Sequence, residues 1–262
     1  MMNKDKFPLA LSMIQPSPLP GSYRNRGEKI ASILNSALKE AEMIAENGFD
    51  GFILQNMNDM PIKQRSNMET VAYMTRIGTE LRRNFPELVM GVLINWDGVA
   101  SLAVADAIEA DFIRIEHLYT GAEVTSAGIL EGQCCDICDL RRKLGSNVPV
   151  YADIFEVHGT HIAPKSIENM AWEIVNEAFA DGIFLSGRTP KESIELSTRA
   201  RTKLKPDVPI FLGGGATGDN IAELIPYFDG VSVATWIKNG DMKNPIDKDR
   251  ARIFIERMKN RK

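Results

Sequence analysis

Eight short apolar segments recur along the chain, and the residue that introduces them alternates between proline and aspartate. Nearly continuous apolar runs without a polar face are typical of parallel strands that are covered on both sides. We therefore expect eight parallel strands. The segments that follow a proline are Leu9–Ile14, Val89–Ile94, Val150–Phe155 and Ile210–Leu212, and those that open with an aspartate are Asp50–Leu54, Asp111–Ile115, Asp181–Leu185 and Asp229–Val233.

Helices between these segments complete the pattern. The first, from about Glu28 to Asn47, has apolar residues at helical spacing and a stop at Gly48. This order predicts an α/β fold, and 262 residues suffice for a (β/α)8 TIM barrel that forms a single domain over residues 1–262. The alternation suggests either a fourfold doubling of a two-strand unit or a coincidence of turn chemistry. Further helices are expected near residues 67–84, 99–109, 132–143, 166–180, 191–203, 219–227 and 248–260.

A glycine run, Gly213–Gly218, follows the seventh expected strand, and the eighth strand ends in small residues. Backbone N–H groups exposed by such turns suit a phosphate, and barrels of this type place phosphate sites after strands seven and eight. We predict a phosphate site at Gly214, Gly215, Ala234 and Thr235. The alternative is that the glycines only make tight turns. The run is neither a dinucleotide fingerprint nor a Gly-Lys-Ser/Thr loop, which argues against nucleoside triphosphate chemistry.

Long connections are expected after strands, at residues 15–27, 56–66, 116–131, 156–165 and 235–247. In a barrel these connections gather on one face, which usually carries function. Polar side chains at the strand ends beneath them need partners or a ligand. We expect Gln55, Asn56 and Asn95 to contact the substrate.

The ends of the fourth and fifth strands carry the candidate catalytic residues Arg114, Glu116, Asp153 and His158. Asp153 and His158 are predicted to form an acid–base centre, because a histidine titrates near neutrality. The alternative is that Asp153 pairs with Arg114 inside the barrel in a buried ion pair without a catalytic part. The two interpretations are compatible, since active sites also use such pairs to shift pKa values.

The spacing of Glu116, His117, Asp153 and His158 matches no metal-ligand pattern, and we predict neither a metal nor another cofactor. A Schiff-base mechanism is disfavoured, because no lysine lies at the end of an expected strand and a lysine nucleophile must be held and desolvated.

The composition of the chain limits the classes of partner that we expect it to bind. A net charge of −4 with scattered basic residues gives no footprint for nucleic acid. No apolar run approaches the about 18 residues of a membrane helix, so we expect no membrane insertion. Three clustered cysteines, Cys134, Cys135 and Cys138, suit reduced thiols that pack as small hydrophobes and predict a cytoplasmic location. The expected partner is a small phosphorylated substrate, and a homo-oligomer through outer helices or loops is compatible with the fold.

Several motifs, in matching order over most of the chain, resemble the BtpA family, which includes SgcQ-like proteins. The resemblance implies a TIM barrel of the ribulose-phosphate-binding type, in a family linked by name to photosystem I biogenesis yet resembling sugar-phosphate enzymes. Val157, where the family tends to have lysine, and the short segment Ser186–Pro190 depart from its pattern. The motifs are Gln55–Pro61, Asp111–Arg114, Gly128–Gly132, Ala152-Asp153 with His158, Gly213–Asn220, Asp229-Gly230, Trp236–Lys238 and Asn244–Asp247.

Together these observations predict an enzyme that acts on a small phosphorylated sugar or related metabolite by acid–base chemistry, as an isomerase, epimerase or lyase. The alternative is a non-catalytic assembly or stability factor for a partner complex. An enzyme should gather its polar groups in an enclosed pocket beside the phosphate loops. An assembly factor should instead expose a contiguous apolar patch.

Overall fold

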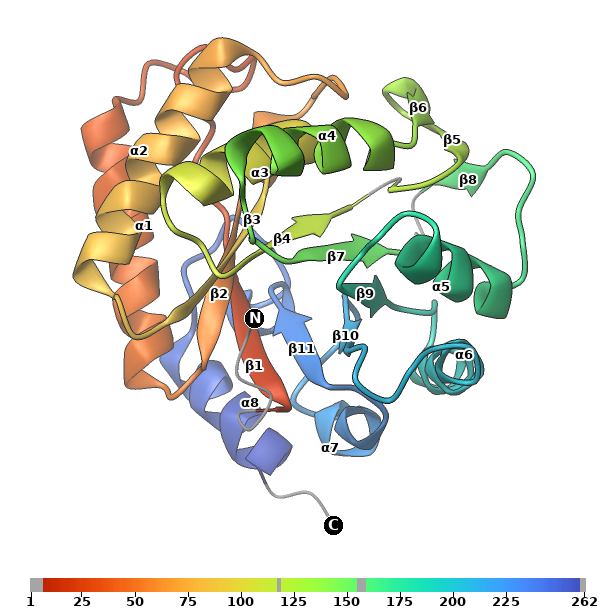
Figure 1. Ribbon diagram of the computed structural model, residues 1–262. Helices are drawn as coiled ribbons and strands as arrows, with labels where there is room; N and C mark the ends of the chain where they lie inside the picture. Colours follow the sequence, from red (N-terminus) through yellow and green to blue (C-terminus); the bar gives the residue numbers. More distant parts are fainter. Residues whose placement is uncertain (1–6, 117–118, 155–158, 260–262) are drawn as a thin grey trace.

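A computed structural model describes residues 7–116, 119–154 and 159–259, in which eight parallel strands close into a barrel with helices around it (Figure 1). Each strand agrees within two residues with a segment expected from the sequence, so the predicted fold class is confirmed. In barrel order the strands are β1 (Leu9–Ile14), β2 (Gly51–Gln55), β3 (Val89–Leu93), β4 (Phe112–Ile115), β7 (Val150–Asp153), β9 (Gly182–Leu185), β10 (Ile210–Leu212) and β11 (Gly230–Val233).

The helices pack their apolar faces on the outside of the barrel. The last but one is shorter than expected, because Pro226 has no N–H to continue an α-helix and the chain passes into a 3-10 turn at Ile225–Tyr227. The helices are α1 (Ile30–Glu46), α2 (Met68–Asn84), α3 (Gly98–Ala107), α4 (Cys134–Leu144), α5 (Ile167–Asn176), α6 (Pro190–Arg201), α7 (Ile221–Leu224) and α8 (Lys248–Lys259).

Apolar side chains fill the barrel interior beneath the C-terminal ends of the strands. They come from alternate positions of the strands, so the inside is a packed core and not a pore. Aromatic rings dominate it, and the ring centroids of Phe184 and Phe211 lie 5.1 Å apart. The polar side chains at the C-terminal ends of the strands therefore stand on an apolar floor. The buried residues of this core are Leu9, Leu11, Met13, Ile53, Leu93, Phe112, Tyr151, Phe184 and Phe211.

The aspartate that precedes each of β2, β4, β9 and β11 clamps the start of the preceding barrel strand. Asp181, for example, donates its N–H to the carbonyl oxygen of Val150 at 2.8 Å, and its Oδ2 accepts the N–H of the same residue at 2.9 Å. This double contact occurs four times, which gives the alternation in the sequence a structural basis. The pairs are Asp50 with Ala10, Asp111 with Met90, Asp181 with Val150 and Asp229 with Ile210.

A small antiparallel sheet lies beside the barrel next to α4 and α5 (Figure 1). Its strands are β5 (Ala122–Thr125), β6 (Gly128–Glu131) and β8 (Thr160–His161). The sequence prediction that residues 116–131 and 156–165 are only loops is thus wrong. Strands of two to four residues that bury at most one residue each carry too weak a signal to stand out from a loop.

No helix within the described ranges is long and apolar enough to span a membrane. That residues 1–262 form a single domain stays a prediction.

We expect the aspartate clamps to stabilise the barrel measurably. Asp181→Ala removes a charged acceptor from a strand N–H and an ion pair with Arg141, and should lower the free energy of unfolding by about 1–3 kcal/mol. Asp249→Ala, at an aspartate whose side chain is 84% exposed on α8, should change it by about 0.5 kcal/mol or less. Urea denaturation measures both, and equal losses would contradict the clamp.

Candidate functional site

A cavity of about 600 Å³ opens where the strands of the barrel end. Glycines and small residues from the loops after β10 and β11 form one side of it, and polar side chains from β2 and β4 form another. The predicted site residues that line this cavity are Gln55, Arg114, Glu116, Gly214, Gly215, Ala234 and Thr235.

The loop after β10 is held in a defined shape. The side chain of Asn220 accepts the N–H of Thr217 at 2.8 Å and donates to the carbonyl oxygen of Gly215 at 2.9 Å. Gly215 has a φ of +74°, a conformation that favours glycine. A side chain at Gly218 would collide with the ring of Trp236, which explains a second glycine of the run.

Several N–H groups of these loops have no hydrogen-bond acceptor among the residues that the structure describes. They include those of Gly214, Gly215, Ala234 and Thr235, from two neighbouring strand ends that line one cavity. Because α7 has only four residues, its dipole adds little to the field at this place. The anion-binding capacity of the loops therefore rests on these separate N–H groups rather than on a helix end.

Arg114 and Asp153 form a buried ion pair at the mouth of the barrel. Arg114 Nε lies 3.0 Å from Asp153 Oδ2, and Arg114 Nη2 lies 3.0 Å from Asp153 Oδ1. The guanidinium also donates to the carbonyl oxygen of Gly213 at 3.3 Å and stands 4.5 Å from the centre of the Phe184 ring. Arg114 thus links β4 and β7 to the glycine loop, and it lines the cavity while Asp153 lies behind it.

A chain of side-chain amides leads to Glu116 across the other side of the mouth. Gln15 Nε2 donates to Gln55 Oε1 at 2.8 Å, and Gln55 Nε2 donates to Asn95 Oδ1 at 2.9 Å. Glu116 Oε2 accepts hydrogen bonds from Gln55 at 3.2 Å and from Asn95 at 3.0 Å. The first four strands of the barrel therefore hold one carboxylate in place with neutral donors.

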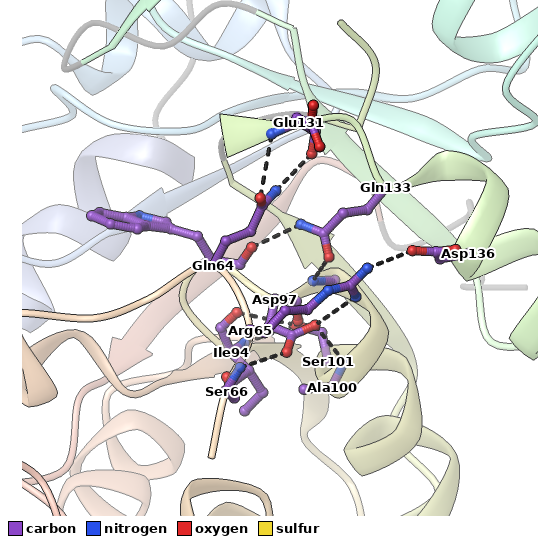
Figure 2. Close-up of polar contacts among 12 residues, drawn as sticks. Gln64, Arg65, Ser66, Ile94, Asp97, Ala100, Ser101, Glu131, Gln133 and Asp136 are labelled. Atoms are coloured by element: carbon purple, nitrogen blue, oxygen red, sulfur yellow. Dashed lines mark hydrogen bonds and ion pairs between the residues drawn. The ribbon is translucent and has the colours of Figure 1, made fainter. Parts of the chain in front are cut away.

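The segment after β3, which contains Asn95, is braced by a polar network around Asp97 (Figure 2). Asp97 accepts the N–H groups of Ser66 at 2.8 Å and Ala100 at 3.0 Å, and Arg65 bridges it to Asp136. The segment before α2 is thereby tied to the starts of α3 and α4, which fixes the side of the mouth where Asn95 lies.

Four predicted residues, Asp153 among them, either do not line the cavity or lie outside the described residues. Asn56 uses its side chain within the protein: Oδ1 accepts the N–H of Asn95 at 2.8 Å, and Nδ2 donates to Asp59 at 3.1 Å. Burial raises the pKa of Asp59 in this cluster. Asn95 is fully buried beside the cavity. His158 lies outside the described residues, so its predicted role as catalytic partner of Asp153 stays a prediction.

Gln15, Ser232 and Arg250 line the cavity but are absent from the set that the sequence predicts. Gln15 directly follows β1, so the expectation that polar side chains at strand ends need partners or a ligand applies to it as well. Arg250 belongs to α8, donates to the carbonyl oxygen of Trp236 at 3.0 Å and stands 5.0 Å from the centre of that ring. Tertiary packing alone brings it to the mouth, and no sequence pattern marks it.

The cysteines on α4 lie away from the cavity. Cys135 is exposed, so the prediction that these thiols pack as buried hydrophobes is wrong for it. Burial raises the pKa of Cys134 to about 11, which disfavours its reactive thiolate at neutral pH. Within the part of the chain that the structure describes, no three histidine, cysteine, aspartate or glutamate side chains gather as a metal site. His117 and His158 lie outside that part.

We expect Asp153→Asn to destabilise the barrel by about 3–5 kcal/mol, because it removes the negative charge of Asp153 from the buried guanidinium of Arg114. The double change Arg114→Met with Asp153→Leu removes both charges and should cost less than the single change. Urea denaturation gives both values. A double variant less stable than the single one would contradict this account of the pair.

Solved structures with a similar fold include two enzymes. N-(5'-phosphoribosyl)anthranilate isomerase from Pyrococcus furiosus has a TM-score of 0.57 and 17% identity, with 96% of this chain and 98% of that chain covered. N-acetylmannosamine-6-phosphate 2-epimerase from Clostridium perfringens has a TM-score of 0.54 and 13% identity, with 87% of each chain covered. These likenesses show the fold, a TIM barrel.

Relatives match the chain over nearly its whole length. An uncharacterized protein of Thermococcus kodakarensis is 33% identical over 257 residues, 97% of this chain and 96% of that one. The Photosystem I biogenesis protein BtpA of Synechocystis is 34% identical over 256 residues, 95% of this chain and 87% of that one. Residues 7–260 match the sequence model of the BtpA family, and the chain therefore belongs to that family.

Proposed function

We propose that this protein is an enzyme that binds a small phosphorylated sugar or related metabolite in the barrel-mouth cavity and converts it by acid–base chemistry. The observation that carries the proposal is the convergence of two groups on one cavity. Unused N–H groups of the loops after β10 and β11 lie on one side of it, and a positioned carboxylate lies on the other.

The phosphate group would bind to the N–H groups of Gly214, Gly215, Ala234 and Thr235. Arg250 adds a positive charge to the same wall, and no described acidic side chain forms an ion pair with it. Preorganised N–H groups and a fixed guanidinium suit a phosphate dianion, because both favour the charged ligand without reorganisation. Ser232 holds the two loops together, since its Oγ donates to the carbonyl oxygen of Gly213 at 3.1 Å.

Glu116 is our candidate for the group that moves a proton. Its carboxylate lines the cavity and is oriented by the amides of Gln55 and Asn95, so it can face a substrate carbon held by the phosphate. Arg114, oriented by Asp153, supplies a fixed cation that can stabilise an oxyanion formed when that proton leaves. Isomerases, epimerases and some lyases use this combination.

The names of structurally similar proteins support the proposal by analogy. Those names include an isomerase, a 2-epimerase and a synthase, each with a phosphate in the name of the compound. At 17% identity or less these likenesses concern the fold. Experiment must therefore decide whether the reaction is that of an isomerase, an epimerase or a lyase.

A second candidate function is assistance to the assembly of a partner complex. The name of the Synechocystis relative indicates such a role for that protein. In this chain the small sheet exposes Val124 and Ile129, which are directly opposed on β5 and β6 and are 48% and 64% exposed. An exposed apolar pair of this kind is compatible with a docking site.

We expect Arg250→Gln to raise the dissociation constant for inorganic phosphate and for sugar phosphates about tenfold or more, because it removes a charged donor. Arg252→Gln, at an exposed arginine on the same helix, is the matched control and should leave binding unchanged. Isothermal titration calorimetry measures both constants. Equal effects of the two substitutions would contradict the phosphate site.

We expect Glu116→Gln to lower turnover of the substrate about 10²–10⁴-fold while phosphate binding stays intact, since only the proton transfer is lost. The substrate would first be found by a thermal-shift screen, in which a ligand at 100 times its dissociation constant adds about 2.7 kcal/mol of stability. Full turnover in a folded Glu116→Gln protein would rule out this carboxylate as the acid–base group.

A further inference from the structure

A second cavity, of about 690 Å³, lies outside the barrel mouth, between the loop after β1, helix α1 and the loop after β11. It is separated from the barrel-mouth cavity by Gln15, which lines both. The loop after β11 also borders both, since Met242 lines the mouth and Lys243 the second cavity.

Four basic side chains line the second cavity, namely Arg24, Arg26, Lys39 and Lys243. None of them forms an ion pair with a described acidic residue, although the chain as a whole carries a net charge of −4. Like charges gathered around one cavity repel each other, and a bound anion relieves that repulsion. This lining indicates an anionic ligand.

The one acidic residue among the described lining residues does not offset these charges. Glu40 is neutralised by Lys238, whose Nζ lies 3.0 and 3.1 Å from the two carboxylate oxygens. Lys238 is fully buried, although the sequence places it in a loop. The ion pair of Glu40 and Lys238 contributes no net charge. The four basic side chains therefore give the cavity a net positive charge.

The walls of the cavity are preformed. Asn25, in the loop that carries Arg24 and Arg26, donates to the carbonyl oxygens of Pro18 at 2.7 Å and of Glu28 at 3.1 Å. Oε1 of Gln15, a residue only 7% exposed, has no hydrogen-bond donor among the described residues. It is an acceptor that a hydroxyl or amino group of a ligand can satisfy.

Much of the remaining lining is apolar, so the ligand should combine its negative charges with an apolar body. Flat proline faces and an adaptable methionine suit such a body. The apolar lining residues are Ile14, Pro16, Pro18, Ala37, Met43, Pro245 and Ile246.

We propose that this cavity is a second binding site, for an organic phosphate with an apolar body and at least two negative charges, of which a nucleoside diphosphate is the representative. The basic side chains bind the phosphates, the proline and methionine wall packs against the body, and Gln15 accepts a hydrogen bond from it. The site does not depend on phosphate binding at the barrel mouth, although Gln15 would let the two occupants sense each other.

Calorimetric titration of the full chain with ADP, inorganic diphosphate and adenosine tests this proposal. We expect ADP to bind at least tenfold more tightly than either of the others. The double variant Lys39→Gln with Lys243→Gln should weaken ADP binding at least tenfold. Its matched control, Lys191→Gln with Lys203→Gln, changes two exposed lysines on or beside α6 and should leave ADP binding unchanged.

Arg250→Gln, which alters the barrel mouth, should also leave ADP binding unchanged, so failure of the mouth site and failure of this site are distinguishable. Absence of ADP binding would overturn the proposal. So would equal affinities for ADP and inorganic diphosphate, or equal losses in the two double variants, because either shows general charge attraction only.

Discussion

The buried ion pair of Arg114 and Asp153 holds the mouth of the barrel together. It joins β4 to β7, reaches the carbonyl oxygen of the glycine loop after β10, and rests on the aromatic floor through Phe184. Two charges taken out of water are stable only with excellent geometry, and the bidentate contact provides it. The contacts of the guanidinium with Asp153, Gly213 and Phe184 hold it in place in the cavity wall.

Most of the barrel can be predicted from the sequence, because each strand is a local apolar run. The aspartates that introduce half of these runs mark real contacts, such as the clamp of Asp181 on Val150. The small sheet escapes prediction, since β5 and β6 have four residues each and each buries only one of them, which is too little for a strand pattern to show. The early end of α7 follows from Pro226, a residue whose effect on a helix is known.

The candidate site is predictable where it follows from strand ends and not where it follows from tertiary packing. The glycine loop and the carboxylate of Glu116 lie where the barrel topology requires them, and both line the cavity. Arg250 reaches the same cavity from the last helix, and Asn56 turns away to hold Asp59, which no linear pattern indicates. The direction of a side chain at a strand end depends on contacts with residues that are distant in the sequence, and these contacts cannot be inferred from the local pattern.

The central claim is that the loops after β10 and β11 bind a phosphate group, and a crystal structure grown in phosphate tests it most directly. We predict an anion within about 3 Å of the N–H groups of Gly214, Gly215, Ala234 and Thr235, with the guanidinium of Arg250 beside it. Phosphate bound only elsewhere, with these N–H groups facing solvent, would contradict the account.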